Sequence, residues 1–329
     1  MKDIDVFGIG NPLIDLLSHV SSDFLRAQGL EKDRMYLVDY EGQKEIISRL
    51  EESGSEILHA PGGSCANSMI GLCQLGGTAA YSGKIGFDKF GKIYKEKLEA
   101  AAVESSLAEG DGPTGSSLIL VPEDGSRTMN THLGISQKFH VSDVSEALLR
   151  RSQFLYIEGY LWDTEEQKEA ILLTIAKARQ YGVKISLSLS DPFCVDRHAE
   201  EFNTLLKENV DMVFCNQEEA FGLTNTNISQ EALYKLGDSV ETVVMTLGSK
   251  GALIFHENEM TYVDSFSVEV IDTTGGGDAF AAGFLYGITH GKSASESGRI
   301  ASALAALIIN QLGPRVQGDW EPKLKELLG

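Results

Sequence analysis

The sequence predicts an α/β protein with a central, mostly parallel β-sheet, helices on both faces of that sheet, and a small second β-sheet. Two patterns and the size of the chain support this prediction. Short β-branched runs alternate with longer helical patterns through most of the sequence, and one region instead forms a hairpin pattern. The 329 residues, 42% of them hydrophobic, are enough to bury a large core.

The alternating elements are predicted from runs of apolar residues and from the helical patterns between them. Buried strands are expected at 6–9, 154–157, 184–189, 212–215 and 242–246, and helices at 165–181, 199–208, 230–236 and 297–311. Helices between strands return the chain to the same end of the sheet, so the strands pair in parallel. Ligands bind at the carboxyl ends of such strands.

The predicted hairpin comprises Ser116–Pro122 and Ser126–His132, joined by the turn Glu123-Asp124-Gly125. A hairpin within an α/β chain often projects from the main sheet. We expect the segments 14–40 and 113–135 to form a small β lid over the strand ends. With no repeat or linker in the sequence, residues 1–329 are expected to form one unit with this lid inserted in it.

The overall charge and composition exclude several classes of partner. A formal net charge of −20 argues against nucleic acid and against an anionic membrane surface. The first residues show neither the basic nor the apolar region of a secretion signal, so we do not expect secretion, and no apolar run is long enough to cross a bilayer. The cysteines show neither CxxC pairs nor metal-ligand spacing, so we expect buried free thiols in a reducing cytoplasm; they are Cys65, Cys73, Cys194 and Cys215.

The segment Val270–Phe284 carries the strongest chemical signal in the chain. It begins as a short β-branched run, expected to be a strand that ends at Asp272, passes through Gly275-Gly276-Gly277, and continues as a buried helical pattern. Glycines at a helix start leave backbone N–H groups exposed at the positive end of the dipole, which favours anion binding. Asp278 in that position would repel phosphate, but it is well placed to take a proton from an attacking hydroxyl. The segment therefore predicts phosphoryl transfer to an alcohol.

Two further motifs are candidates for binding the acceptor. Asn11 and Asp15 follow the first strand, and a carboxylate can accept hydrogen bonds from two adjacent hydroxyls; an ordinary turn with an Asx cap is the alternative. Gly62 and Gly63 open a helix of small residues, and Asn67 on its first turn can reach a ligand. A tight turn with close helix packing explains the glycines as well, but it explains Asn67 less well.

The remaining motifs are candidates for binding the nucleotide and its metal. Asn216 and Glu219 follow a strand and are predicted to contact phosphate and Mg²⁺-bound water; a helix cap is the alternative. Thr246, Gly248 and Gly251 surround a glycine turn that would let a base and ribose lie against the backbone. Asn310 ends a helix where it can reach an adenine edge, although a polar end on a core helix also explains it.

Motifs of other enzyme classes are missing from the sequence. It contains no HExxH, no serine or cysteine nucleophile elbow, no GxxxxGK[ST] loop, and no GxGxxG after the first strand. These absences disfavour a metallohydrolase, a Ser-His-Asp enzyme, a P-loop enzyme and a dinucleotide-dependent oxidoreductase.

Taken together, the motifs resemble the ribokinase-like (PfkB) family of sugar and nucleoside kinases, in order, over nearly the whole chain. Asp272-Thr-Thr-Gly-Gly-Gly-Asp278 is similar to the family's DTxGAGD signature, with Gly276 in place of the usual alanine. Residues 62–77 resemble its first signature, and Asn216–Glu219 resembles its NxxE motif. Within the family, residues 10–15, 127–134 and 187–193 resemble adenosine kinases, although Asp191 replaces a small residue.

The resemblance implies a role for each candidate residue. Asp278 is the implied base, the amides of Gly275–Gly277 stabilise the γ-phosphoryl group, and Arg127 approaches that group with the lid. The implied acceptor residues are Asn11, Asp15, Gly62, Gly63 and Asn67. The implied nucleotide residues are Asn216, Glu219, Thr246, Gly248, Gly251 and Asn310, with Glu219 also holding Mg²⁺ through water and Asp272 lying near a K⁺ site.

The implied reaction is transfer of phosphate from ATP to a primary hydroxyl of a nucleoside or sugar, with the 5′-hydroxyl of adenosine favoured. A sugar kinase of the fructokinase or ribokinase type is the alternative, followed by a non-catalytic nucleotide- or sugar-binding relative. The expected cofactors are ATP and Mg²⁺, with K⁺ as a secondary expectation. Both a monomer and a homodimer are compatible with the sequence.

Overall fold

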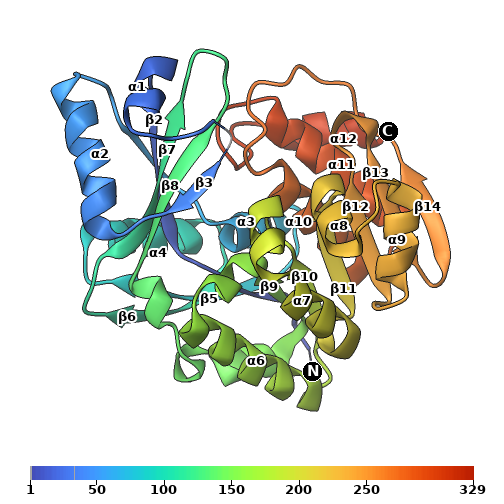
Figure 1. Cartoon of the computed structure of the whole chain (residues 1–329). Coiled ribbons are helices and arrows are strands. Elements are labelled where there is room, and N and C mark those ends of the chain that lie inside the picture. The colour runs from blue at the N-terminus through green and yellow to red at the C-terminus, as the bar shows by residue number, and fades with distance from the viewer. Residues whose placement is uncertain (1, 33) are drawn as a thin grey trace.

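The alternating pattern forms the main sheet of the computed structural model, which describes residues 2–32 and 34–329. Within these residues the sheet has nine strands in the order β14-β13-β12-β11-β10-β9-β1-β5-β6 (Figure 1). The strands from β6 to β12 pair in parallel, whereas β13 and β14 are antiparallel. Their bounds are β1 Ile4–Ile9, β5 Ala79–Gly86, β6 Glu104–Gly110, β9 Ser152–Glu158, β10 Lys184–Ser188, β11 Met212–Asn216, β12 Thr242–Thr246, β13 Ala252–His256 and β14 Glu259–Val263.

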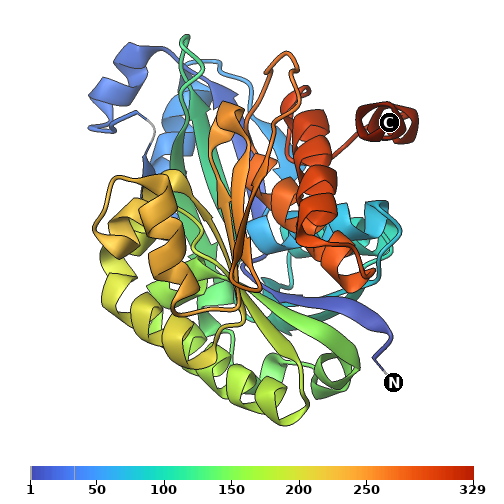
Figure 2. The same cartoon turned by 90° about the vertical axis from the view of Figure 1, so that its right-hand side faces the viewer.

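Helices cover both faces of this sheet, as Figure 2 shows. One face carries α5 Glu146–Arg151, α6 Glu165–Gln180, α7 Pro192–Asn209, α8 Gln217–Thr224 and α9 Ser229–Gly237. The other face carries α3 Ser64–Gln74, α4 Lys89–Ala100, α10 Gly276–Thr289 and α11 Ala294–Ile309, and α12 Glu321–Leu328 contacts α11. Short 3-10 turns lie at Ile135–Lys138, Val141–Asp143, Gly159–Asp163 and Gly248–Lys250.

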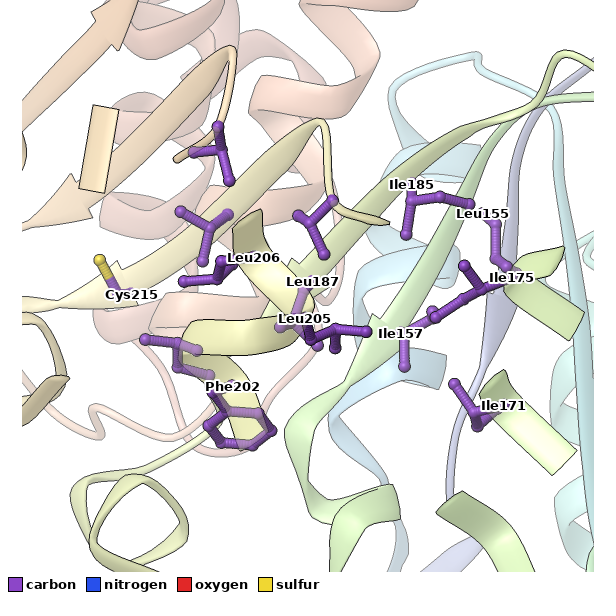
Figure 3. Packing of buried hydrophobic residues seen from close by; sticks show 14 of the residues in the cluster. Leu155, Ile157, Ile171, Ile175, Ile185, Leu187, Phe202, Leu205, Leu206 and Cys215 are labelled. Atoms are coloured by element: carbon purple, nitrogen blue, oxygen red, sulfur yellow. The ribbon is translucent and has the colours of Figure 1, made fainter. Parts of the chain in front are cut away.

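A large apolar cluster stabilises the first of these faces. Side chains of β9, β10 and β11, such as Leu155 and Leu187, pack against α6 and α7 through Ile171, Ile175 and Phe202 (Figure 3). Each is at most 1% exposed, so the sheet and helices enclose a dry layer whose burial drives folding. The predicted α/β class is confirmed.

A second sheet of five strands, in the order β3-β8-β7-β2-β4, lies apart from the first within the described residues (Figure 1). Its strands are β2 Leu13–His19, β3 Met35–Leu37, β4 Leu58–Pro61, β7 Thr114–Val121 and β8 Thr128–Gly134. The predicted hairpin is confirmed, because β7 and β8 pair antiparallel with Ser117 opposite Thr131. β4 was not predicted as part of this sheet. Residues 1 and 33, which fall in the ranges predicted for the whole unit and for the lid, lie outside the described residues.

Two helices that were not predicted, α1 Ser22–Ala27 and α2 Tyr40–Glu52, accompany the second sheet. On α2, Gln43 donates through Nε2 to the carbonyls of Ser116 (3.0 Å) and Asn130 (2.8 Å). The Ser116 hydroxyl also donates to Gln43 Oε1 (2.7 Å), so this side chain of the hairpin faces α2. The alternate residues Ser117, Ile119, Met129, Thr131 and Leu133 line a cavity on the other face. The two-residue period of the strands separates a covered face from a face that is free to meet a ligand.

The strand predicted to end at Asp272 is wrong, because residues 264–275 form a loop. Val270 and Ile271 are 58% and 53% exposed, so their β-branched side chains do not pack in a sheet. The amides of Ile271 and Asp272 instead donate to the carbonyl of Ile309, at 2.8 and 3.2 Å. β-branched composition predicted a strand, but the end of α11 supplies the hydrogen-bond partners here.

Smaller expectations are corrected in the same way. The predicted helix at 297–311 runs over Ala294–Ile309. The cysteines are free, and Cys73 is half-buried where burial was expected. In the part of the chain that the structure describes, no helix combines the length and apolar character needed to cross a membrane.

Candidate active site

The first turn of α3 forms the floor of the candidate site. Gly63 caps this helix with φ of +87°, a backbone conformation that favours glycine. A Cβ atom at Gly63 would lie 2.7 Å from the carbonyl of Asn11, and one at Gly62 would lie 2.3 Å from both carboxylate oxygens of Asp15. The glycine pair therefore lets two polar groups of the β1–β2 region approach the start of a helix.

Asp278 lies over this helix start, although 211 residues separate it from Asn67. Its Oδ1 accepts a hydrogen bond from Ser64 Oγ (2.7 Å), and its Oδ2 accepts one from Asn67 Nδ2 (3.0 Å). Burial raises the pKa of Asp278, and these two donors oppose that rise. The α3 helix thus holds the carboxylate in a fixed orientation with the ionised form favoured by two donors.

The glycine run begins α10 and turns the chain toward Asp278. Gly275 has φ of +76°, and a Cβ there would lie 2.6 Å from Pro314 Cβ. The N–H of Gly276 donates to the Thr273 carbonyl at 3.2 Å, so it is partly engaged within the loop. A Cβ at Gly277 would meet nothing within 4 Å. First-turn amides of a helix have no intrahelical acceptor, and these lie at the positive end of the α10 dipole.

A cavity of about 310 Å³ extends from Asp278 toward the carboxyl ends of β10, β11 and β12. Of the residues predicted to hold the nucleotide and phosphate, it brings together Asn216, Glu219, Thr246, Gly275 and Gly277. Backbone and short polar groups predominate near the glycines. The cavity therefore places an anion-binding helix start beside Asp278, with space for a polyphosphate.

Asn216 and Glu219 form a reciprocal capping box at the start of α8. Asn216 donates through its backbone N–H (2.9 Å) and Nδ2 (2.6 Å) to the two oxygens of Glu219, and Glu219 N–H donates to Asn216 Oδ1 (2.9 Å). Burial raises the pKa of Glu219 to about 7. The cap predicted as an alternative is thus present, and the same two residues also line the cavity.

This pair fits a magnesium ion held through water. A carboxylate is the hard oxygen group that Mg²⁺ prefers, and Mg²⁺ usually keeps several waters. Each oxygen of Glu219 accepts only one hydrogen bond from Asn216 and retains a lone pair for such a water. A divalent ion there would favour the ionised form of Glu219, against the effect of burial.

Three predicted nucleotide residues lie away from the residues that line this cavity. Gly248 and Gly251 have φ of +60° and +88° and bracket the 3-10 turn between β12 and β13. Asn310 caps α11 and donates through Nδ2 to the Glu269 carbonyl at 2.8 Å. Their assignment to the nucleotide stays a prediction.

A second cavity, of about 220 Å³, lies between α3 and the inner face of the lid hairpin. It brings together the predicted acceptor residues Asn11, Asp15, Gly63 and Asn67, while Gly62 lies behind the Asp15 carboxylate. Its lid face is mostly apolar, with Leu13, Met35, Leu37, Ile119, Met129 and Leu133. Both cavities are lined by Ser64, Ser190 and Asp278, so Asp278 stands where they meet.

Glu158 also lines this second cavity, and no motif in the sequence predicted it. It ends β9, is 1% exposed, and accepts hydrogen bonds from the amides of Asn11 (2.7 Å) and Cys65 (2.9 Å). Burial raises the pKa of Glu158 to about 7. An acidic residue directly after an apolar strand, in Tyr156-Ile-Glu158, was the available signal.

Asp15 is the second carboxylate of this cavity. Burial raises the pKa of Asp15 to about 7, with Arg315 and Arg127 opposing the rise and Asp278 adding to it. A carboxylate in such a position gains from hydroxyl donors, because hydrogen bonds to the charged form compensate for lost hydration. The arrangement suits a vicinal diol.

Arg127 connects the lid to the loop before α10. It forms an ion pair with Asp272 and donates to Thr274 Oγ1. Asp272 also accepts from the amides of Thr274 (2.8 Å) and Gly313 (2.9 Å), and its pKa is lowered: these amides and Arg127 outweigh burial. The Arg127 guanidinium beside Asp272 would repel a K⁺ ion at this carboxylate, and the K⁺ site stays a prediction.

Arg315, after α11, was also missed. Its Nε donates to Asn67 Oδ1 at 3.1 Å, and Asn67 in turn donates to Asp278, so Asn67 connects Arg315 to the carboxylate through two hydrogen bonds. Burial lowers the pKa of this guanidinium, while nearby acidic groups oppose that effect. A loop arginine far from every recognised motif leaves little signal in one sequence.

Comparison with known proteins identifies the family of this arrangement. Residues 36–320 match the family described as pfkB family carbohydrate kinase, which is most of the chain. The chain belongs to the PfkB family. The sequence motifs predicted a ribokinase-like PfkB kinase, and this prediction is confirmed.

Individual relatives match the chain over nearly its full length. The crystal structure of an adenosine kinase from Sinorhizobium meliloti is 35% identical, with a TM-score of 0.91, covering 98% of this chain and 99% of that one. A probable sugar kinase from Rhizobium etli CFN 42 is 38% identical, with a TM-score of 0.93 and 99% coverage of both chains. An adenosine kinase from Dictyostelium discoideum is 26% identical, covering 99% of this chain and 100% of the relative.

Proposed function

We propose that this PfkB kinase transfers the γ-phosphate of ATP to the 5′-hydroxyl of a nucleoside, with adenosine as the favoured acceptor. The observation that carries the proposal is the position of Asp278 where two different cavities meet. One cavity offers helix-start amides to phosphate, and the other offers carboxylates to hydroxyls. A hydroxyl at their junction would lie beside both the base and the phosphoryl group.

The chemistry follows from this position. Asp278 takes the proton of the acceptor hydroxyl as its oxygen attacks the γ-phosphorus. A new phosphorus–oxygen bond forms while the bond from the γ-phosphorus to the β-phosphate oxygen breaks, and ADP leaves. The amides at the start of α10 stabilise the charge on the transferring group, and Arg127 of the lid lies nearby to neutralise it. When bound, Mg²⁺ held near Glu219 offsets phosphate charge.

The lining of the acceptor cavity favours a nucleoside over a free sugar. A ribose can place its diol against Asp15 and Asn67 on the polar floor. A flat, largely apolar base can then cover the lid side chains, such as Ile119 and Leu133. A free sugar carries hydroxyls on all sides and would leave some unpaired against this apolar face, which is costly. The full-length similarity to adenosine kinases agrees with this choice.

Other expectations belong to the same proposal. The covering of the outer lid face by α2 favours a monomer, which light scattering after gel filtration would test. A cytoplasmic location stays a prediction. K⁺ activation also stays a prediction, with the Arg127–Asp272 pair counting against it, and turnover in K⁺ against turnover in Na⁺ decides it.

The deciding experiment measures ADP formation with Mg²⁺ and ATP against adenosine, inosine, ribose, fructose and a sugar phosphate. Asp278→Asn, prepared in parallel, controls for contaminating kinases. Turnover on adenosine that is absent in the variant supports the proposal. Turnover on a free sugar instead would move the chain to the sugar-kinase alternative and keep the catalytic assignments. ATP binding without turnover on any acceptor would contradict both and favour a binding protein.

A further inference from the structure

Arg315 lies where it can influence the base without being part of any recognised motif. Its loop is anchored at several points: Gly313 N–H donates to Asp272 (2.9 Å), Pro314 packs on the Cα of Gly275, and Arg315 itself donates to Asn67. The Arg315 carbonyl also accepts from Gln311 Nε2. The loop that carries the Arg315 guanidinium is therefore fixed to the loop that carries the glycines at the start of α10.

The hydrogen bond from Arg315 determines which way the Asn67 amide points. A guanidinium only donates, so the Asn67 oxygen must face Arg315 and its NH₂ group must face Asp278. The measured contacts agree, at 3.1 Å from Arg315 Nε to Asn67 Oδ1 and 3.0 Å from Asn67 Nδ2 to Asp278 Oδ2. With the amide reversed, an oxygen acceptor would face a carboxylate, which would disfavour the ionised base.

The charge of Arg315 acts in the same direction. Ser64 and Asn67, both on α3, donate hydrogen bonds to Asp278. The titratable side chains that interact with it electrostatically are Asp15, Glu158, Cys65 and Tyr156. Burial raises the pKa of Asp15 and of Glu158 to about 7, so these carboxyls add negative charge near the base only as they ionise around that pH. Arg315 is the cation whose attraction opposes the rise that burial causes in the pKa of Asp278. A positive charge near a carboxylate favours its ionised form.

We propose that Arg315 is a positioning residue for the phosphoryl transfer, which keeps Asp278 ionised by fixing the Asn67 amide and by supplying a positive charge. The inference rests on the proposed function for its kinetic consequence, because Asp278 must be ionised to accept the hydroxyl proton. The contacts themselves do not depend on which acceptor is used.

The test compares Arg315→Met and Arg315→Lys with Arg299→Met, a change at an exposed arginine that donates to the Leu328 carbonyl. In Arg315→Met, the acidic limb of kcat/KM should move up by about 1 pH unit, the low end of the range for loss of one nearby opposite charge. Arg315→Lys keeps the charge and should move it less, while the Arg299 variant should match the wild type. The KM for ATP should stay within about twofold.

A second measurement does not need turnover. In protein labelled with ¹³C at aspartate carboxyls, the Asp278 signal, assigned through Asp278→Asn, should titrate at higher pH in Arg315→Met. An unchanged Asp278 titration or an unchanged acidic limb would overturn the inference, as would a large change in ATP KM alone. If no acceptor were turned over, only the proposed function would fail, since the titration still decides the role of Arg315. Should Arg315→Met not fold, Arg315→Gln replaces it in both measurements.

Discussion

The two cavities that meet at Asp278 are built from different kinds of groups. On the nucleotide side, the helix start of α10 and the cap of α8 contribute the glycines, Asn216 and Glu219, which are local features of short motifs. On the acceptor side, side chains arrive from β2, β3, α3, β7, β8 and β9, many of them apolar.

This difference explains why the reaction is easier to infer than its acceptor. A phosphate-binding helix start requires a backbone conformation, and a few glycines in sequence encode it. Acceptor choice depends on side chains that distant segments bring together, and each of them has an ordinary structural explanation when seen alone. Variants that change the kinetics of one substrate and spare the other would support this difference between the cavities, and variants that affect both substrates equally would contradict it.

Asp278→Asn should have the largest effect, because it removes the carboxylate at the junction of the two cavities. We expect kcat to fall by about 10²–10⁴, the usual scale for a positioned base, with ATP binding nearly intact. The amide keeps the shape of the side chain, so the melting temperature should change little. Single-turnover kinetics and ATP titration measure the two quantities, and wild-type turnover in this variant would remove Asp278 from catalysis.

Asp15→Ala should separate the two cavities. Loss of two hydrogen bonds to a charged group should raise the acceptor KM by about a hundredfold, while the ATP KM changes by less than about twofold. Asp23→Ala, at an exposed position on α1 near the same sheet, is the matched control. Steady-state kinetics with each substrate varied in turn checks this. Equal effects on both KM values would place Asp15 outside the acceptor site.

Glu219→Gln should give the opposite pattern. Groups that hold metal-bound water usually change metal affinity by about tenfold or more, so the Mg²⁺ concentration for half-maximal rate should rise by about tenfold. The acceptor KM should stay near its wild-type value. Glu218→Gln, one residue earlier and exposed, controls for the loss of one charge. A Mg²⁺ dependence identical to that of the control would leave Glu219 as a helix cap alone.

Most of the fold followed from local patterns, because buried strands and amphipathic helices have distinct periods. The β7–β8 hairpin and the parallel strands β1, β9, β10, β11 and β12 were predicted correctly for this reason, whereas β5 and β6 were missed. The strand predicted to end at Asp272 was wrong, since exposed β-branched residues such as Val270 and Ile271 look like strand residues when their neighbours are unknown. The short strand β4 was missed because four residues, mostly exposed, carry little periodic signal.

For the site, the sequence predicted the residues that short motifs encode and missed those that only tertiary structure brings close. Ser64 adjoins the predicted Gly63, yet its hydrogen bond to Asp278 spans 214 residues of sequence. Glu158 and Arg315 come from a strand end and a C-terminal loop, with nothing local to distinguish them from ordinary polar residues. Asp278 was predicted as the base because a carboxylate beside three glycines at a helix start would repel a phosphate and so needs another role.

The smallest predicted effect concerns pH and stability on the acceptor side. The pKa of Asp15 is raised to about 7 in the folded protein, whereas an aspartate in an unfolded chain titrates near its ordinary value of 3.8. The folded state therefore retains a proton that the unfolded state has lost, and Asp15 increasingly destabilises the ligand-free fold as pH rises between these values. Asp15→Asn should remove this penalty. Its melting temperature relative to the wild type should rise between about pH 4 and pH 7 and level off above that range.

Calorimetry without ligands, repeated with Asp23→Asn as control, checks the trend. If the difference in melting temperature between variant and wild type became smaller as pH rises, Arg315 and Arg127 would compensate for the charge of Asp15. The acceptor cavity would then be preorganised for charge, as the nucleotide cavity is.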